Sequence, residues 1–207
     1  MTSIAALILA GGKGERLGGV AKAELRINGQ RLIDRLGAVL DGLDPILVAL
    51  GPMPQRPVAL PHPMVALPPE PAATGPLGGL LAALPALSAA RPDLVLMLAV
   101  DTPFFPPDFL ERATALLGDA HAVCAAWHGQ RYPTNVLFRT QPLLDLLQDR
   151  QRAQMLGSPR VVLSQMRTVS LDYAGLAASD PFASINTIAD LLACQRRAGF
   201  PQAWAKT

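Results

Sequence analysis

Residues 4–22 read IAALILAGGKGERLGGVAK, an apolar stretch that runs directly into a loop rich in glycine and cations. The apolar part is typical of a buried strand. Five of the fourteen residues from 9 to 22 are glycine, and Lys13, Arg16 and Lys22 add positive charge. Glycine lets the backbone approach a ligand closely, and successive N–H groups backed by cations bind phosphate. This stretch predicts a strand that ends in a loop holding the phosphates of a nucleotide.

Two common phosphate-binding motifs do not fit this loop. The dinucleotide fingerprint G-x-G-x-x-G would begin at Gly12, but its third glycine position holds Leu17. The Walker pattern needs Gly-Lys-Ser/Thr after four spacers, and counting from Gly14 reaches Gly19 followed by Val20. The sequence therefore supports neither a dinucleotide-binding fold nor a P-loop NTPase.

Short apolar runs alternate with stretches of helical periodicity along the rest of the chain, as in a parallel sheet with crossover helices. We expect strands at 4–10, 46–50, 64–67, 94–100 and 168–171, an antiparallel pair at 122–127 and 134–138, and helices at 32–43, 75–87, 108–117, 141–148 and 187–197. Asp108 should cap its helix, and Pro85 should bend or end the helix that contains it. The expected architecture is α/β, a single Rossmann-like three-layer domain with a mostly parallel sheet and an antiparallel portion in the second half.

Composition limits the classes of function. With 207 residues, half of them apolar, 16% charged and a net charge of +2, the chain should form one globular domain without a nucleic-acid or membrane-surface partner. Its longest strongly apolar run, 94–100, is far short of the roughly 20 residues of a membrane span. The N-terminus lacks a signal-peptide pattern, so we expect a cytoplasmic protein. Cys124 and Cys194 have no metal-ligand spacing and read as buried thiols.

A second chemical signal is Asp101, which follows the all-apolar run at 94–100. Ligands of open α/β sheets bind beyond the carboxyl ends of the strands, where both Asp101 and the glycine loop are expected. A carboxylate there is well located to hold Mg²⁺, which takes one or two carboxylates together with phosphate oxygens and water. The alternative is that Asp101 merely caps a turn.

The glycine loop is similar to the signature of nucleotidyltransferases that activate a phosphate-bearing acceptor with a nucleoside triphosphate. Here the signature reads Leu9-Ala10-Gly11-Gly12, Arg16-Leu17-Gly18 and Lys22, with Leu17 in place of the usual Met. Within that superfamily the chain resembles the molybdenum cofactor guanylyltransferases over nearly its whole length. The further matching segments are Gly75-Pro76-Leu77-Gly78-Gly79 and residues 101–108, 128–133 and 182–187.

The resemblance implies a nucleotide-diphospho-sugar transferase-like fold in one domain, 1–207. Residues 1–118 would form its nucleotide-binding half and residues 119–207 its acceptor-binding half. It implies transfer of GMP from GTP to the phosphate of molybdopterin, with Mg²⁺ as cofactor and proteins that deliver the molybdenum cofactor to molybdoenzymes as further partners.

The resemblance also assigns residues. The catalytic residues would be Arg16, Lys22 and Asp101, the metal ligands Asp101 and Asn186, and the nucleotide-binding residues Leu9, Ala10, Gly11, Gly12, Lys22, Gly78 and Asp101. Two assignments have structural alternatives. Asn186 is equally interpreted as the N-cap of the helix that begins at Thr187, and the glycines at 75–79 as packing residues.

Other readings stay open. The chain departs from the family at residues 49–51, at Glu70 and at Ser184, all expected near base, ribose or metal. A cytidylyltransferase or a sugar-phosphate nucleotidyltransferase is therefore the nearest alternative, and a non-catalytic nucleotide-binding protein the next. Gly11 favours guanine, because the cytidylyl relatives typically carry alanine there. The candidates for binding the acceptor are His128, Arg131, Tyr132, Arg152 and Arg160.

Overall fold

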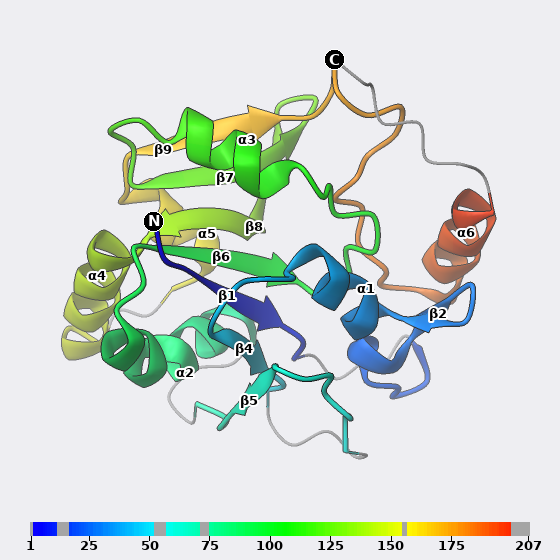
Figure 1. The fold of residues 1–207 in the computed structure, drawn as a ribbon, viewed down its shortest axis with the longest axis horizontal. Coiled ribbons are helices and arrows are strands. Elements are labelled where there is room, and N and C mark those ends of the chain that lie inside the picture. The colour runs from blue at the N-terminus through cyan, green and yellow to red at the C-terminus, as the bar shows by residue number, and fades with distance from the viewer. Residues whose placement is uncertain (1, 12–16, 52–56, 71–74, 155–156, 200–207) are drawn as a thin grey trace.

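The computed structural model describes residues 2–11, 17–51, 57–70, 75–154 and 157–199. Its centre is a seven-stranded sheet between two layers of helices (Figure 1). The strands of this sheet are β1 (Ile4–Leu9), β4 (Ile46–Ala49), β5 (Val65–Leu67), β6 (Leu94–Ala99), β7 (Ala122–Trp127), β8 (Gln130–Arg139) and β9 (Thr168–Asp172). The helices are η2 (Lys22–Glu24), α1 (Leu32–Val39), α2 (Gly75–Ala90), α3 (Phe109–Leu116), α4 (Thr140–Arg152), α5 (Pro159–Ser164) and α6 (Ile188–Ala198).

The strand order is β5-β4-β1-β6-β8-β7-β9. Every neighbouring pair is parallel except the two pairs that involve β8, which runs against the others. The expected mostly parallel α/β sheet, with its antiparallel part in the second half, is confirmed.

The alternation of side chains explains the three layers. Along β6, Leu94, Leu96 and Leu98 face the core beneath α1, α3 and α6, whereas Val95 and Met97 face the core beneath α2, α4 and α5. Successive side chains of a strand point to opposite faces, so a strand covered on both sides must be apolar at every position. All six residues of β6 are buried, as this rule requires.

Helix α2 does not end at Pro85, so the expectation that the proline would end this helix is wrong. It continues to Ala90, and its apolar positions on either side of the proline, including Leu84 and Leu87, are buried against the sheet. Pro85 itself is exposed, so its ring lies away from the face of the helix that packs on the sheet.

Asp108 precedes α3 as expected, but its side chain makes no capping hydrogen bond. The carboxylate instead accepts hydrogen bonds from the Tyr173 hydroxyl at 2.9 Å and from Arg112 Nε at 2.6 Å. These two partners hold it away from the helix N-terminus, so the expected side-chain cap is wrong.

The antiparallel pair is longer than expected, because only His128 and Gly129 form the turn between β7 and β8. Both have positive φ, 47° and 78°, which suits a tight hairpin turn. The Asp172 carboxylate accepts hydrogen bonds from both backbone N–H groups and from that of Ala174. These bonds lower the pKa of Asp172, with the Ala174 N–H contributing most. β8 consequently begins at Gln130.

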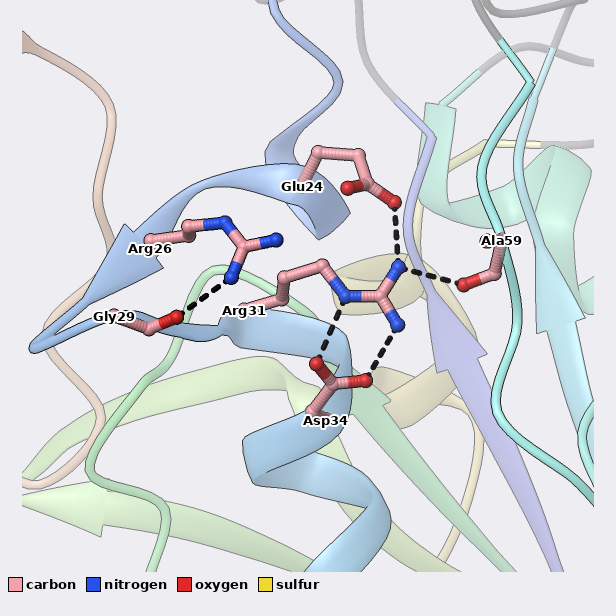
Figure 2. A network of polar contacts seen from close by, with 6 residues as sticks. All are labelled: Glu24, Arg26, Gly29, Arg31, Asp34 and Ala59. Atoms are coloured by element: carbon pink, nitrogen blue, oxygen red, sulfur yellow. Dashed lines mark hydrogen bonds and ion pairs between the residues drawn. The ribbon is translucent and has the colours of Figure 1, made fainter.

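A small hairpin, β2 (Arg26–Ile27) and β3 (Gln30–Arg31), was not expected from the sequence. Figure 2 shows the Arg31 guanidinium at its base. It bonds both carboxylate oxygens of Asp34 (2.8 and 2.7 Å), Glu24 Oε1 (2.9 Å) and the Ala59 carbonyl (2.8 Å). The Arg31 side chain is 15% exposed. One side chain therefore joins η2, the start of α1 and the segment that precedes β5.

Two further observations bear on the expectations. Cys124 and Cys194 are buried free thiols, and burial raises the pKa of Cys124 to about 11. Among the residues that the structure describes, no helix combines the length and the apolar character that crossing a membrane requires.

The first turn of α2 packs on the ends of β1 and β4 through Gly79. A Cβ added there would lie 2.5 Å from Leu9 Cδ2 and 3.0 Å from Ala49 Cβ. We expect Gly79→Val to lower the free energy of unfolding by about 1–3 kcal/mol, since the core there has no room. Urea denaturation measures the change.

Gly175→Val is the matched control, because nothing lies within 4 Å of a Cβ at Gly175. A loss of stability at Gly175 equal to that at Gly79 would contradict the packing argument.

The Arg31 hydrogen bonds lower the pKa of Asp34. A carboxylate whose folded pKa lies below its unfolded value of about 3.9 contributes stability that is complete above that value and is lost as pH falls through the folded value. We expect Asp34→Asn to cost about 1–2 kcal/mol at neutral pH, and the deficit to shrink below about pH 4. Thermal or urea unfolding at pH 7 and pH 3 measures it.

Asp149→Asn is the control for Asp34→Asn. Asp149 pairs with Arg152 at 3.4 Å, and both side chains are more than 70% exposed (73% and 76%). Loss of this exposed ion pair should change the free energy of unfolding by less than about 0.5 kcal/mol. A deficit of Asp34→Asn that stays constant from pH 7 to pH 3 would contradict the ion-pair account.

Candidate active site

Three parallel strands end at the same level. Leu9 is in register with Ala49 of β4 and with Ala99 of β6. The Leu9 carbonyl accepts a hydrogen bond from Val100 N, and Ala10 N donates to the Ala49 carbonyl. The loops that follow β1, β4 and β6 therefore leave the sheet side by side, at the edge where open α/β sheets bind ligands.

Lys22, Asp101 and Asn186 converge at this edge. Lys22 Nζ donates a hydrogen bond to Asp101 Oδ2 at 2.5 Å and another to Asn186 Oδ1 at 2.7 Å. The side chains of Lys22 and Asp101 are each 15% exposed. Residues predicted from three distant segments thus form one cluster, with a cation between two oxygens.

The structure decides between the two interpretations of Asn186. Thr187 is the N-cap of α6 and accepts a hydrogen bond from Asp190 N at 3.1 Å. Asp190 Oδ2 in turn accepts from the backbone N–H groups of Asn186 and Thr187, completing a capping box. These contacts lower the pKa of Asp190, the Asn186 N–H contributing most. Asn186 is therefore not the cap, and its amide oxygen faces Lys22.

Asp101 lies on a braced turn. The buried Thr102 donates its hydroxyl to the Ala99 carbonyl at 2.7 Å, and the Asp101 carbonyl accepts from Ile185 N at 2.9 Å. Ala99 N, at the point where β6 and β8 separate, donates to the side chain of Asn135 at 3.1 Å. Asn135 is completely buried, and the sequence analysis missed it. The available signal was a single amide directly before the apolar run at 136–138 of β8.

Aromatic packing holds the Asp101 and Asn186 loops together. The ring of Phe182 packs edge-on against Tyr173 (5.4 Å between centroids) and lies 5.9 Å from Phe105 and 5.3 Å from Tyr132. The Tyr132 hydroxyl donates to Asp180 Oδ2 at 2.6 Å. Burial of the ring raises the pKa of Tyr132, and this hydrogen bond raises it further. The contacts of Phe182 and Asp180 thus hold the loop at 180–186 in place just before Asn186.

The first turn of α2 faces the same edge. Gly79 touches the last residues of β1 and β4, and the preceding Gly78 is buried. The free N–H groups and positive dipole end of α2 therefore lie beside the ends of those strands, a suitable place for an anion. For Gly79 the packing interpretation is correct, whereas Gly78 remains a predicted nucleotide contact.

Gly11 has a packing role that the sequence did not reveal. A Cβ on Gly11 would lie 3.2 Å from both the Cα and the N of Gly51. The loops after β1 and β4 approach too closely for a larger residue without movement. The packing against Gly51 therefore favours glycine at this position whichever nucleotide base is bound.

Two predicted residues, Gly12 and Arg16, lie outside the described residues. Leu9 and Ala10 are buried at the end of β1. Among the described residues there is no group of three or more His, Cys, Asp and Glu side chains that could hold a metal ion. Within the described part of the edge, the two side-chain oxygens that meet Lys22 come from one carboxylate, Asp101, and one amide, Asn186.

The five predicted acceptor-binding residues do not form a cluster. Tyr132 is bound to Asp180, and Arg131 Nε donates to Ser170 Oγ at 2.8 Å. His128 lies in the β7–β8 turn, while Arg152 and Arg160 are exposed on α4 and α5. In the described part of the chain, these five side chains share no hydrogen bond or ion pair.

Comparison with solved structures gives the fold. Molybdopterin-guanine dinucleotide biosynthesis protein A from Archaeoglobus fulgidus is 21% identical, with a TM-score of 0.68, and the match covers 95% of this chain and 98% of that one. The 2-C-methyl-D-erythritol 4-phosphate cytidylyltransferase from Thermus thermophilus is 19% identical, with a TM-score of 0.69, covering 97% and 100%. The corresponding cytidylyltransferase from Francisella tularensis is 15% identical, with a TM-score of 0.67, covering 95% and 100%.

At the level of sequence, no curated protein matches the chain. The family model described as the MobA-like NTP transferase domain matches residues 6–169, from β1 into β9. The matched range contains the glycine loop, Lys22 and Asp101. The chain is therefore a nucleotidyltransferase that belongs to the family of MobA-like NTP transferase domains.

Proposed function

We propose that this nucleotidyltransferase transfers GMP from GTP to the terminal phosphate of molybdopterin, giving the guanine dinucleotide cofactor and pyrophosphate. The observation that carries the proposal is the convergence of Lys22, Asp101 and Asn186 at the carboxyl edge of the sheet, on which the N-terminal part of α2 also packs. The choice of guanine and molybdopterin is supported by the segments that resemble molybdenum cofactor guanylyltransferases and by the name of the Archaeoglobus neighbour.

The reaction needs no covalent protein nucleophile. An oxygen of the acceptor phosphate attacks the α-phosphorus of GTP in line, a new P–O bond forms, and the bond from that phosphorus to the β-phosphate oxygen breaks. Pyrophosphate leaves with the electron pair. Catalysis therefore rests on positioning the two phosphates and on stabilising the charge on their oxygens.

The residues at the carboxyl edge of the sheet would supply both the positioning and the charge stabilisation. Lys22 would contact the α-phosphate and the attacking phosphate, and Arg16 would hold the rest of the triphosphate. The N-terminus of α2, with Gly78, and the backbone at 9–12 would bind the nucleotide. Cations and free N–H groups aimed at phosphate oxygens stabilise the charge that develops on them during transfer.

Asp101 and Asn186 suit a magnesium ion. Their side-chain oxygens already share one cationic neighbour, at 2.5 and 2.7 Å, and both are hard oxygen donors. Mg²⁺ takes one or two carboxylates and completes its shell with phosphate oxygens and water. When bound, the ion would supply charge neutralisation at the triphosphate.

The second candidate is a cytidylyltransferase acting on a sugar or polyol phosphate. The Thermus cytidylyltransferase superposes as well as the Archaeoglobus protein, with TM-scores of 0.69 and 0.68. In addition, the close approach of Gly11 to Gly51 accounts for the glycine that otherwise favours guanine.

Pyrophosphate release with Mg²⁺ and molybdopterin, measured with GTP, CTP, ATP and UTP in parallel, tests the proposal. We expect turnover with GTP and little with the other three. Turnover with CTP alone would move the protein to the cytidylyl activity. If molybdopterin gave no turnover with any of the four nucleotides and a sugar or polyol phosphate did serve as acceptor, the molybdopterin assignment would be overturned. Silence with those acceptors too would favour a nucleotide-binding protein.

Asp101→Asn separates catalysis from nucleotide binding. It keeps the shape of the side chain but removes the charge, so we expect transfer to fall about 100-fold or more. Metal-free GTP binding, followed by fluorescence or calorimetry, should not weaken, because phosphate is held mainly by cations and N–H groups.

Asp145→Asn removes a carboxylate of the same size from the surface of α4, where its partner is Gln141, and should leave transfer unchanged. Full activity of Asp101→Asn would show that this carboxylate takes no part in the reaction.

A further inference from the structure

The Lys22 ammonium lies where a divalent cation would have to bind. Its two hydrogen-bond acceptors, Asp101 Oδ2 and Asn186 Oδ1, are the two oxygens that the proposed function assigns to the metal. Mg²⁺ binds oxygen at about 2.0–2.1 Å, whereas an ammonium lies about 2.7–2.9 Å away in a hydrogen bond. A metal ion bound to both oxygens would have to lie between them, in the space that the Lys22 ammonium occupies, so the two cations cannot hold this position together. The ammonium also repels a second cation at that distance.

Of the three residues, Asp101 and Asn186 are held in place by their own backbone contacts. Asn186 is anchored through its backbone N–H to Asp190 and by the start of α6. Asp101 is anchored by the Ile185 N–H and the buried Thr102 turn. Lys22, in contrast, reaches them with a four-carbon stem that has many rotamers. A change of partner is therefore a movement of the lysine side chain and needs no rearrangement of the loops.

We propose that Lys22 is an internal cation that closes the metal site of the nucleotide-free protein and opens it by moving onto the incoming triphosphate. This inference deepens the proposed function, because it concerns the same site. The triphosphate offers the ammonium new anionic oxygens and leaves Asp101 and Asn186 free for the cation that travels with the nucleotide. Divalent metal and nucleotide consequently bind as one unit, and metal alone binds poorly.

Binding of Mn²⁺ alone, followed by electron paramagnetic resonance without nucleotide or acceptor, tests the inference. We expect Lys22→Met to bind Mn²⁺ at least about tenfold more tightly than the wild type, because the competing ammonium is gone. The double variant Lys22→Met/Asp101→Asn should lose that gain. Equal or weaker Mn²⁺ binding by Lys22→Met would overturn the inference.

Arg26→Met is the matched control. It removes one positive charge four residues from Lys22. The Nη1 atom of Arg26 donates a hydrogen bond to the Gly29 carbonyl within the β2–β3 hairpin (Figure 2). The Mn²⁺ affinity of this variant should equal that of the wild type. A gain as large as that of Lys22→Met would mean that general charge, and not the position of the ammonium, controls metal binding.

A second measurement uses the wild type, so it does not depend on the folding of a variant. The sequence contains three lysines, Lys13, Lys22 and Lys206, which makes their ammonium signals tractable by ¹⁵N NMR. Mg²⁺ alone should leave the Lys22 signal unchanged, and Mg²⁺ with GTP should shift it. A shift caused by Mg²⁺ alone at the same concentration would overturn the inference.

These results are separable from the proposed function. Tighter Mn²⁺ binding by Lys22→Met would stand even if GTP and molybdopterin gave no turnover. Turnover with GTP together with unchanged Mn²⁺ binding would retain the proposed function and remove the role of Lys22 as an internal cation.

Discussion

Strand β1 is held between β4 and β6 with its last residue, Leu9, level with Ala49 and Ala99. The strand is buried on both faces. A shift of its register by one residue would turn every β1 side chain to the opposite face of the sheet. This register brings the starts of three loops together. It also places the first turn of α2 beside them, through the contact of Gly79 with Leu9 and Ala49. The geometry of the candidate site follows from this alignment.

On that framework, each polar residue of the site is held by a different kind of contact. Thr102 and Asn135 satisfy the backbone of Ala99 where the sheet opens, which steadies the turn that carries Asp101. The capping box of α6 is formed by Thr187 and Asp190, which leaves the Asn186 side chain to accept a hydrogen bond from Lys22. The Arg31 network in Figure 2 ties the helix that carries Lys22 to α1 and to residue 59. The ion pair between Lys22 and Asp101 thus joins two separately supported loops.

Apolar periodicity, which is a local signal, predicted the α/β sheet. The resemblance to a nucleotidyltransferase family, carried by short motifs, assigned Lys22, Asp101 and Asn186 to one site. Neither signal predicted what depends on contacts between distant segments. The bonds of Arg31 reach residues 24, 34 and 59, and no local pattern encodes that reach. The packing of Gly11 against Gly51 is equally non-local, and it changes what the glycine implies about the base. Arg16 lies outside the described residues, so its role stays a prediction.

A crystal structure with GTP and Mn²⁺, with anomalous scattering used to locate the metal, tests the central claim most directly. The account predicts a manganese peak between Asp101 and Asn186, the triphosphate against the first turn of α2, and the Lys22 ammonium on a phosphate oxygen. A nucleotide bound away from the carboxyl edge of the sheet, or manganese bound elsewhere while Lys22 keeps its contact with Asp101, would contradict it.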